Sequence, residues 1–334
     1  MSKNSANELL PANLQEHRAV KAWRQIRPEC FEPESIQILK HKNKKSAVYR
    51  LTGADSNGSA VIAKRCRATT ASVERVIYEK FLTRLSLPAL SCYGFMPEPE
   101  GEWCWLFLED AGAREYSLDS AEDRALAGRW LATVHRASRI TDLRTQLPDR
   151  GPDHYLQQLR SVRIALLERV DNPVLSADEV ALLQTVAAHC DIIEAHWTEL
   201  ERFCEGVPRT LVHGDFVLKN LRIQPDAISP ALLVFDWEMA GWGVPAADLA
   251  EVQHCATPDL DVYCSVLRQD FPQLDARDIR RLANYGNLLR VMDKIFWETL
   301  ALEGDSYLFL VRPLRTLMKY EPQLAAARRA VHWS

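Results

Sequence analysis

The residues with the clearest chemical potential lie in the sequence LVHGDFVLKNLRI at positions 211–223. His213 and Asp215 follow a short apolar run that is typical of a strand, and Asn220 lies five residues beyond Asp215. A second apolar run, LLVF, ends at Asp236. One carboxylate can orient an attacking hydroxyl and accept its proton, while an amide and a second carboxylate can hold Mg²⁺ on nucleotide phosphates. The pattern therefore predicts phosphoryl transfer.

Neither half of this pattern is specific alone, because an Asp after a strand often forms a turn or caps a helix. Here, however, HGDxxxxN is followed sixteen residues later by Asp236 in DWE, and then by GVPAADL, which contains Asp248. Several spacings must coincide to produce this order. A purely structural role for the whole set is therefore a poor explanation.

With these motifs, the chain resembles the aminoglycoside phosphotransferase and choline kinase-like family of small-molecule kinases, which have a protein-kinase-like fold. The resemblance is strongest over residues 210–250 and extends more weakly from about residue 36 to the last helices. It implies that Asp215 is the catalytic base and that Asn220 and Asp236 bind Mg²⁺. It also implies that His213 and Asp248 brace the catalytic loop and that Glu238 assists at the metal or the substrate.

The pattern of elements before and after residue 110 predicts two parts of different character. We expect a helix at about residues 9–27. Short β-type runs follow at 36–39, 47–51, 60–66, 90–95 and 103–109, and one helix, at 73–85, lies between the third and fourth of these runs. From Ser120, helical patterns dominate, apart from short β-type runs within 210–243. We expect an α+β, bilobal, protein-kinase-like fold. Residues 1–109 would form a small antiparallel β-sheet lobe that binds nucleotide and carries an N-terminal helical extension, and residues 110–334 a larger, mainly α-helical lobe for catalysis and substrate.

Lys64 lies in the strand-like sequence AVIAKRC, in a position that resembles the lysine that holds the α- and β-phosphates of ATP in this fold. Such a lysine needs a carboxylate partner on the following helix to orient it and keep it charged. Glu74 and Glu79 are the candidates, and Glu74 fits the family's helix-then-Pro pattern better. The cofactors that the resemblance implies are ATP and Mg²⁺.

Two further segments complete the expected nucleotide site. The sequence HKNKKSAVYR has no glycine, unlike the phosphate loops of many kinases, so phosphate contact falls to amides near Lys45 and Ser46. WLFLEDAG resembles the family's hinge, whose backbone binds the adenine edge at Leu108, Glu109 and Asp110. His135 matches a helix after the hinge and is expected to be a packed structural residue.

The expected partner is a small-molecule acceptor with a hydroxyl group, such as an amino alcohol, a sugar or an aminoglycoside-like compound. The C-terminal helices offer acidic and aromatic groups that suit an amine by cation–π contact, among them Asp259, Asp261, Tyr285, Asp293, Trp297, Glu298 and Glu303. Arg290 and Lys294 would instead suit a sugar or an anion. The competing interpretation is ordinary amphipathic helices, with Trp297 in the core.

Composition excludes several classes of protein. The 334 residues carry 41 Lys+Arg and 45 Asp+Glu, a net charge of -4, which argues against nucleic acid as a partner. The eight cysteines form no CxxC pair and are expected to be reduced and structural. No apolar run approaches the roughly 20 residues that span a bilayer, and the N-terminus has no apolar signal core. We expect a cytoplasmic monomer or homodimer without a membrane partner.

Three alternatives compete with the small-molecule kinase. A protein kinase-like enzyme should show HRD, DFG and APE motifs, and only eleven residues separate Asp236 from Asp248, too few for a peptide-docking segment. A non-catalytic nucleotide-binding regulator is compatible with the missing glycines, but it need not keep Lys64, Asp215, Asn220 and Asp236 together. A metal-dependent hydrolase would need a second cluster of ligands, which the sequence lacks.

Overall fold

The computed structural model describes residues 8–9, 13–42, 46–112, 114–137, 142–225, 230–302 and 306–333. The chain divides into two compact units. The first comprises residues 1–116 and 220–239, and the second comprises residues 117–219 and 240–334. The segment 220–239, which carries two of the predicted metal ligands, therefore packs with the N-terminal part of the chain. The predicted lobe boundary between residues 109 and 110 stays a prediction.

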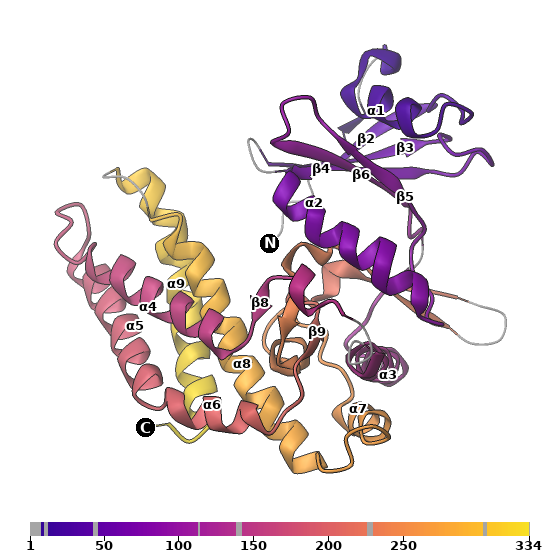
Figure 1. Ribbon diagram of the computed structural model, residues 1–334. Coiled ribbons are helices and arrows are strands. Elements are labelled where there is room, and N and C mark those ends of the chain that lie inside the picture. The colour runs from indigo at the N-terminus through magenta and orange to yellow at the C-terminus, as the bar shows by residue number, and fades with distance from the viewer. Residues whose placement is uncertain are drawn as a thin grey trace. The chain divides into compact units, whose positions relative to one another are not determined.

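The first unit is built on a six-stranded antiparallel sheet in the order β1-β2-β3-β4-β6-β5 (Figure 1). Its strands are β1 (Glu8–Leu9), β2 (Ser35–Lys42), β3 (Ser46–Thr52), β4 (Val61–Arg67), β5 (Cys92–Pro97) and β6 (Trp103–Glu109). The prediction of an α+β fold with an antiparallel N-terminal sheet is confirmed.

Helices cover both faces of this sheet (Figure 1). Helix α1 (Arg18–Ile26) packs Trp23 into a core with Val61 and Ala63 of β4, and the Trp23 indole N–H donates to the carbonyl oxygen of Ala54 at 3.0 Å. Because side chains alternate along a strand, Lys64 points to the opposite face, which α2 covers.

Helix α1 begins later than the predicted segment 9–27. A short 3₁₀ turn, η1 (Leu14–Glu16), precedes it, and residues 8–9 form β1 instead of helix. His17 has an extended backbone, and its Nδ1 accepts the N–H of Ala19 at 3.2 Å, so this side chain caps the helix.

Helix α2 (Ala68–Arg75) continues as a π-helical segment, η2 (Val76–Phe81), and a 3₁₀ turn, η3 (Leu82–Arg84). The sequence pattern predicted this helix over 73–85, so it begins earlier than expected. Its buried face carries Glu74, which is 0% exposed. A carboxylate is thereby directed at the sheet.

A smaller antiparallel sheet of the first unit has the order β11-β10-β7, with β7 (Arg114–Glu115), β10 (Leu221–Gln224) and β11 (Ala231–Val234). Leu221 pairs with Val234, and the Phe235 N–H donates to the carbonyl oxygen of Asn220 at 3.2 Å. This hairpin brings Asn220 and Asp236 to the same end of the two strands. The 3₁₀ turn η7 (Trp237–Met239) follows.

The second unit is mainly helical, as predicted. Its helices are α3 (Ala121–Ala137), α4 (Pro152–Leu167), α5 (Ala177–Ala195), α6 (Trp197–Glu205), α7 (Leu260–Leu267), α8 (Ala276–Thr299) and α9 (Tyr307–Ala330), with 3₁₀ turns η5 (Arg144–Gln146), η6 (Leu218–Asn220, whose last residue belongs to the first unit) and η8 (Pro245–Leu249). A small sheet has the order β8 (Asp149–Arg150), β12 (Gly241–Gly243) and β9 (Thr210–Val212).

None of the helices in the described residues is both long and apolar enough to cross a bilayer. The eight cysteines are free thiols.

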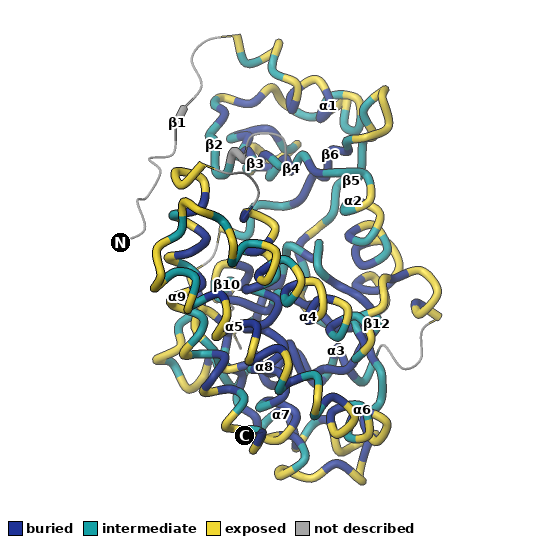
Figure 2. The backbone as a smooth tube through the Cα atoms, turned by 90° about the vertical axis from the view of Figure 1, so that its left-hand side faces the viewer, coloured by how far each residue is buried: buried dark blue, intermediate teal, exposed yellow. Residues whose placement is uncertain are grey.

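Helix α8 is buried along most of its length (Figure 2), and it approaches η8 at backbone distance. A Cβ at Gly286 would lie 1.9 Å from the carbonyl oxygen of Ala246. This contact therefore requires glycine. It also fixes α8 against the segment that carries Asp248.

We expect Gly286→Ala to destabilise the protein, because the new methyl group meets backbone that no side-chain rotation can move. Overpacking costs about 1–3 kcal/mol and outweighs the gain in helix propensity. Urea unfolding measures the change in the midpoint. The matched control is Gly206→Ala at the end of α6, where φ is -82° and a Cβ has ordinary contacts. Equal midpoints for the two variants would contradict the prediction.

Candidate active site

In the first unit, four charged side chains meet where β4, α2 and η7 come together. Lys64 Nζ lies 2.5 Å from Glu74 Oε1 and 3.5 Å from Glu238 Oε2, and it also forms an ion pair with Asp236 Oδ1. Lys64 is 6% exposed. Glu79, the other candidate partner, is exposed and lies near Arg75. The structure thus brings together Lys64, Glu74, Asp236 and Glu238.

Burial and charge act in opposite directions in this cluster. Burial lowers the pKa of Lys64, but the carboxylates of Glu74, Asp236 and Glu238 more than offset it and raise that pKa well above its ordinary value. Burial raises the pKa of Glu74 to about 7, although Lys64 opposes the shift. Lys64 therefore keeps its positive charge, which a phosphate-binding lysine needs.

The same cluster is suited to a divalent cation. One carboxylate oxygen from each of Glu74, Asp236 and Glu238 lies within 4.8 Å of the others. Asn220 is 2% exposed and begins the hairpin that ends beside Asp236. Asp236 has φ of 65°, a strained conformation for a residue other than glycine. Oxygen ligands of this kind are the ones that Mg²⁺ prefers, so the donor set fits the predicted metal.

In the second unit, the buried carboxylate of Asp248 braces the turn that contains Asp215. The backbone N–H groups of His213 and Gly214 donate to Asp248 Oδ2 and Oδ1 at 2.7 and 2.8 Å. His135 Nε2 lies 3.3 Å from Asp248 Oδ2. Burial raises the pKa of Asp248, but His135 and the other hydrogen bonds outweigh it and lower the pKa overall. Asp248 is therefore an ionised acceptor for backbone donors.

His135 was expected to be a structural residue, and it is 0% exposed. Its Nδ1 lies 2.9 Å from the hydroxyl oxygen of Tyr263, which is also buried. The two hydrogen bonds of the ring link α3 and α7 to Asp248. This placement gives His135 a supporting role behind the turn.

Asp215 accepts charge-assisted hydrogen bonds from two cations. Arg290 Nη2 lies 2.7 Å from its Oδ1, and Lys219 Nζ lies 3.2 Å from its Oδ2. Burial raises the pKa of Asp215, but Arg290 and Lys219 more than offset the effect and hold the pKa below its ordinary value. Asp215 is thus ionised at neutral pH and can accept a proton.

The predicted hinge lies at the end of β6. The Glu109 N–H donates to the carbonyl oxygen of Ser91 at 2.9 Å and is therefore already bonded within the sheet. The Asp110 carboxylate accepts from Arg50 Nε at 2.6 Å. Leu108 is buried in β6 opposite Ile62.

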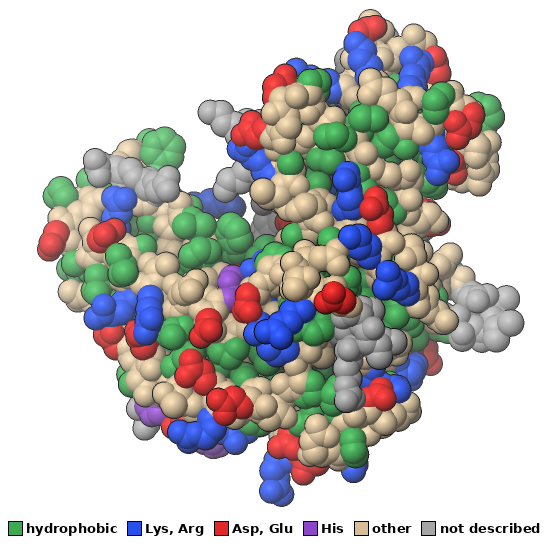
Figure 3. All heavy atoms as spheres, viewed as in Figure 1, with side chains coloured by type: hydrophobic (Ala, Val, Ile, Leu, Met, Phe, Trp, Pro, Cys, Tyr) green, Lys and Arg blue, Asp and Glu red, His purple; other side chains and the backbone are tan. Residues whose placement is uncertain are grey.

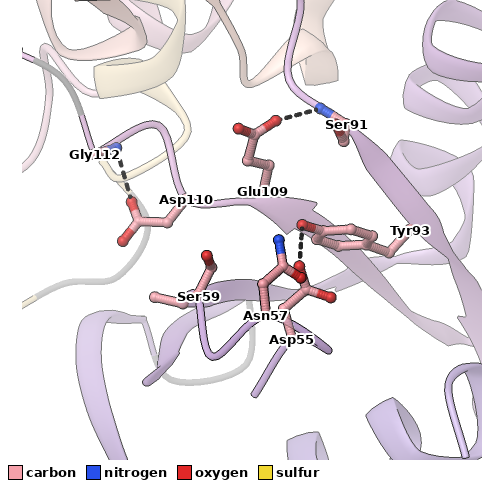
Figure 4. Close-up of a pocket in the computed structure, with 9 residues that line it drawn as sticks. Asp55, Asn57, Ser59, Ser91, Tyr93, Glu109, Asp110 and Gly112 are labelled. Atoms are coloured by element: carbon pink, nitrogen blue, oxygen red, sulfur yellow. Dashed lines mark hydrogen bonds between the residues drawn. The ribbon is translucent and has the colours of Figure 1, made fainter. Parts of the chain in front are cut away.

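Beside the hinge lies a cavity that the sequence did not predict (Figure 4). Its volume is about 580 Å³, and its lining includes Asp55, Tyr93, Glu109 and Asp110. The Tyr93 hydroxyl lies 3.4 Å from Asp55 Oδ2.

The predicted phosphate loop is described only in part. Ser46 begins β3 and pairs with Lys42 of β2, while Lys45 lies outside the described residues.

Some of the residues predicted to line an acceptor site are buried, and others lie on the surface. Tyr285 is 1% exposed and packs against Phe203 and Trp333, and Asp259 caps α7. The expectation that Trp297 lies in the core is wrong, because its side chain is 49% exposed. Figure 3 shows hydrophobic side chains on the surface of the second unit, where the exposed ones on α4, α8 and α9 are Ile164, Leu167, Trp297, Tyr307, Leu308, Phe309 and Met318. Glu303 lies outside the described residues.

Arg290 and Asp293 were among the residues that the C-terminal helices offered to an acceptor, and the structure places both in the interior instead. Both are buried, at 4% and 6% exposure, and Arg290 bonds the turn at Asp215. A signal was present in the sequence LLRVMD, where two opposite charges three residues apart interrupt an apolar helical run. Charged residues are almost never fully buried unless they are paired, so two opposite charges at this spacing could have indicated a buried pair.

The fold matches solved structures of small-molecule kinases. An ethanolamine kinase from Plasmodium vivax shares 13% identity with a TM-score of 0.57, covering 87% of this chain and 82% of that one. Aminoglycoside 2'-phosphotransferase-IIIa in its GDP complex shares 11% with a TM-score of 0.63, covering 90% and 97%. A thermostable mutant of aminoglycoside phosphotransferase APH(4)-Ia, in complex with AMP-PNP and hygromycin B, shares 16% with a TM-score of 0.57, covering 94% and 99%.

These similarities confirm the protein-kinase-like fold. No curated protein matches the sequence. The model of the phosphotransferase enzyme family (APH) matches residues 36–287, which is most of the chain. Recognition of the family from the HGDxxxxN and DWE motifs is thereby confirmed, as is the prediction of a small-molecule kinase as the class of enzyme. The chain belongs to the phosphotransferase enzyme family.

Proposed function

We propose that this protein transfers the γ-phosphoryl group of ATP to a hydroxyl group of a small molecule. The observation that carries the proposal is the buried cluster in which Lys64 lies among Glu74, Asp236 and Glu238. A buried lysine held by carboxylates beside oxygen ligands for a cation suits polyphosphate better than any other common substrate.

Each charged group has a distinct role in this proposal. Lys64 binds the α- and β-phosphates, and Asn220 and Asp236 hold Mg²⁺, with Glu238 assisting. The metal neutralises charge on the phosphates of the bound nucleotide. Glu74 orients Lys64, and Ser46, Leu108, Glu109 and Asp110 supply the remaining contacts to the nucleotide.

Asp215 orients the acceptor hydroxyl and takes its proton as the hydroxyl oxygen bonds to the γ-phosphorus and the bond to ADP breaks. Its ionised state, maintained by Arg290 and Lys219, is the state that this role requires. His213 and Asp248 fix the turn that carries it. The HGDxxxxN spacing and the family membership support the joint action of Asp215 with the metal ligands.

The acceptor classes we propose are amino alcohols, sugars and aminoglycoside-like compounds. Solved structures with the same fold include an ethanolamine kinase and complexes with spectinomycin, kanamycin and hygromycin B. The predictions that the protein is cytoplasmic, is a monomer or homodimer, and has neither nucleic acid nor membrane as a partner stay predictions.

The first test is Mg²⁺-dependent ADP release from ATP against a panel of amino alcohols, amino sugars, simple sugars, nucleosides and aminoglycosides. We expect Asp215→Asn to lower turnover by about 10²- to 10⁴-fold, the contribution typical of a general base, without loss of the fold. Asp236→Ala should abolish turnover by removing a metal ligand.

The matched control is Asp191→Asn on the surface of α5, which should retain the wild-type rate. A wild-type rate in Asp215→Asn would refute the assignment of the base. Stabilisation by MgATP without ADP release from any acceptor would favour the non-catalytic regulator, and transfer to a protein substrate alone would favour the protein kinase-like enzyme.

A second prediction concerns the partner of Lys64. Glu74→Gln keeps the shape of the side chain but removes its charge, so Lys64 loses the carboxylate that holds it against α2. We expect catalytic efficiency for ATP to fall at least about tenfold, because a buried charge-assisted bond is lost. Glu79→Gln on the same helix should change the catalytic efficiency for ATP less than twofold. Steady-state kinetics at varied ATP measures both, and similar losses in the two variants would show that Glu74 has no special role.

A further inference from the structure

Arg290 of α8 makes two hydrogen bonds to the turn that carries Asp215. Its Nη2 donates to Asp215 Oδ1 at 2.7 Å, and its Nη1 donates to the carbonyl oxygen of Gly214 at 2.5 Å. The guanidinium is planar, so two bonds from its two terminal nitrogens fix direction as well as distance. One side chain therefore restrains both the carboxylate and the backbone of the turn.

The turn is held from its other side by Asp248, which accepts the N–H groups of His213 and Gly214. Gly214 has φ of 75°, a conformation that favours glycine. Its N–H and its carbonyl oxygen are thus bonded to two different charged side chains of opposite sign. Asp248 and Arg290 thus restrain the peptide groups on both sides of the Gly214 Cα atom.

Arg290 is itself fixed by two residues that do not touch the turn in the contacts described. Asp293 Oδ2 accepts from Arg290 Nη1 at 3.2 Å, and Asp293 Oδ1 accepts from Gln158 Nε2 of α4 at 3.3 Å. All three side chains are more than nine-tenths buried. A buried guanidinium is costly without partners, and here two carboxylates flank it.

The position of α8 supports this arrangement. Gly286, Arg290 and Asp293 lie at helical positions i, i+4 and i+7 and therefore share one face. At Gly286 the helix contacts Ala246 at backbone distance, within the segment that carries Asp248. The face of α8 that bears Arg290 therefore packs beside the segment that carries Asp248, the other residue that holds the turn.

We propose that Arg290 is a positioning residue for Asp215, and that Asp293 and Gln158 hold it in that role. This inference rests on the proposed function. A purely structural ion pair would be satisfied by Asp293 alone and would not direct two donors at the turn.

The test compares Arg290→Gln, Arg290→Lys and Asp293→Asn with the wild type, using the best acceptor from the panel. A displacement of about 1 Å at a reacting group can cost 10²-fold, so we expect the kcat of Arg290→Gln to fall about 100-fold. Arg290→Lys, which can replace one of the two bonds, and Asp293→Asn should each lose about tenfold. The KM for ATP and the Kd for MgADP should stay within about threefold, because these variants do not touch the nucleotide cluster.

Arg281→Gln is the matched control. Arg281 lies on α8, is exposed, and bonds the Tyr285 hydroxyl at 3.1 Å, away from the turn. Its kcat should equal that of the wild type. Thermal unfolding of each variant shows whether it folds, and if Arg290→Gln does not, Arg290→Lys and Asp293→Asn decide the question.

The outcomes separate this inference from the proposed function. Absence of turnover by the wild-type protein on every acceptor would overturn both. Turnover that is lost in Asp215→Asn but stays within twofold in Arg290→Gln would leave the kinase and overturn the positioning role. Equal loss of kcat and of nucleotide affinity in a folded Arg290 variant would show general structural damage, and would also overturn it.

Discussion

An ammonium group buried among carboxylates is the interaction on which the first unit depends. Lys64 stays charged out of water because Glu74, Asp236 and Glu238 surround it. These partners come from α2 and from the segment after β11, which are far apart in sequence. The ion pairs of one lysine therefore link α2 and the segment after the β10–β11 hairpin to β4, and strand pairing of β10 with β7 adds to the packing of the hairpin with the N-terminal part of the chain.

The second unit applies the same electrostatic principle to a backbone turn. Asp248 is buried and ionised because it accepts N–H groups and faces His135, and Arg290 is buried and charged because it lies between Asp215 and Asp293. In each case a charge that would be costly alone is stabilised by groups whose positions it then fixes. The same hydrogen bonds and ion pairs thus compensate the buried charges and hold the turn rigid.

Sequence reasoning located the strands, the helices and most of the charged cluster, because apolar periodicity and the spacing of HGDxxxxN and DWE are local signals. It placed the start of α1 too early, since the cap at His17 depends on one side-chain hydrogen bond. It left open whether Arg290 faces a substrate or belongs to an ordinary amphipathic helix, and it expected Trp297 in the core, which is wrong. The sequence could not settle either point, because the rotation of a helix about its axis is decided by tertiary packing, here the approach of α8 to η8 at Gly286.

This packing limits which residues can recognise the acceptor. Tyr285, Arg290 and Asp293 face the interior, where they hold α8 and the turn at Asp215, so they do not offer their charges or rings to a ligand. Under the proposed function, discrimination among acceptors would rest on side chains that remain accessible, and Trp297 and Lys219 are exposed in this unit. Accessible side chains are under little constraint from the fold, and for that reason the features that reveal the chemistry of this family do not reveal its acceptor.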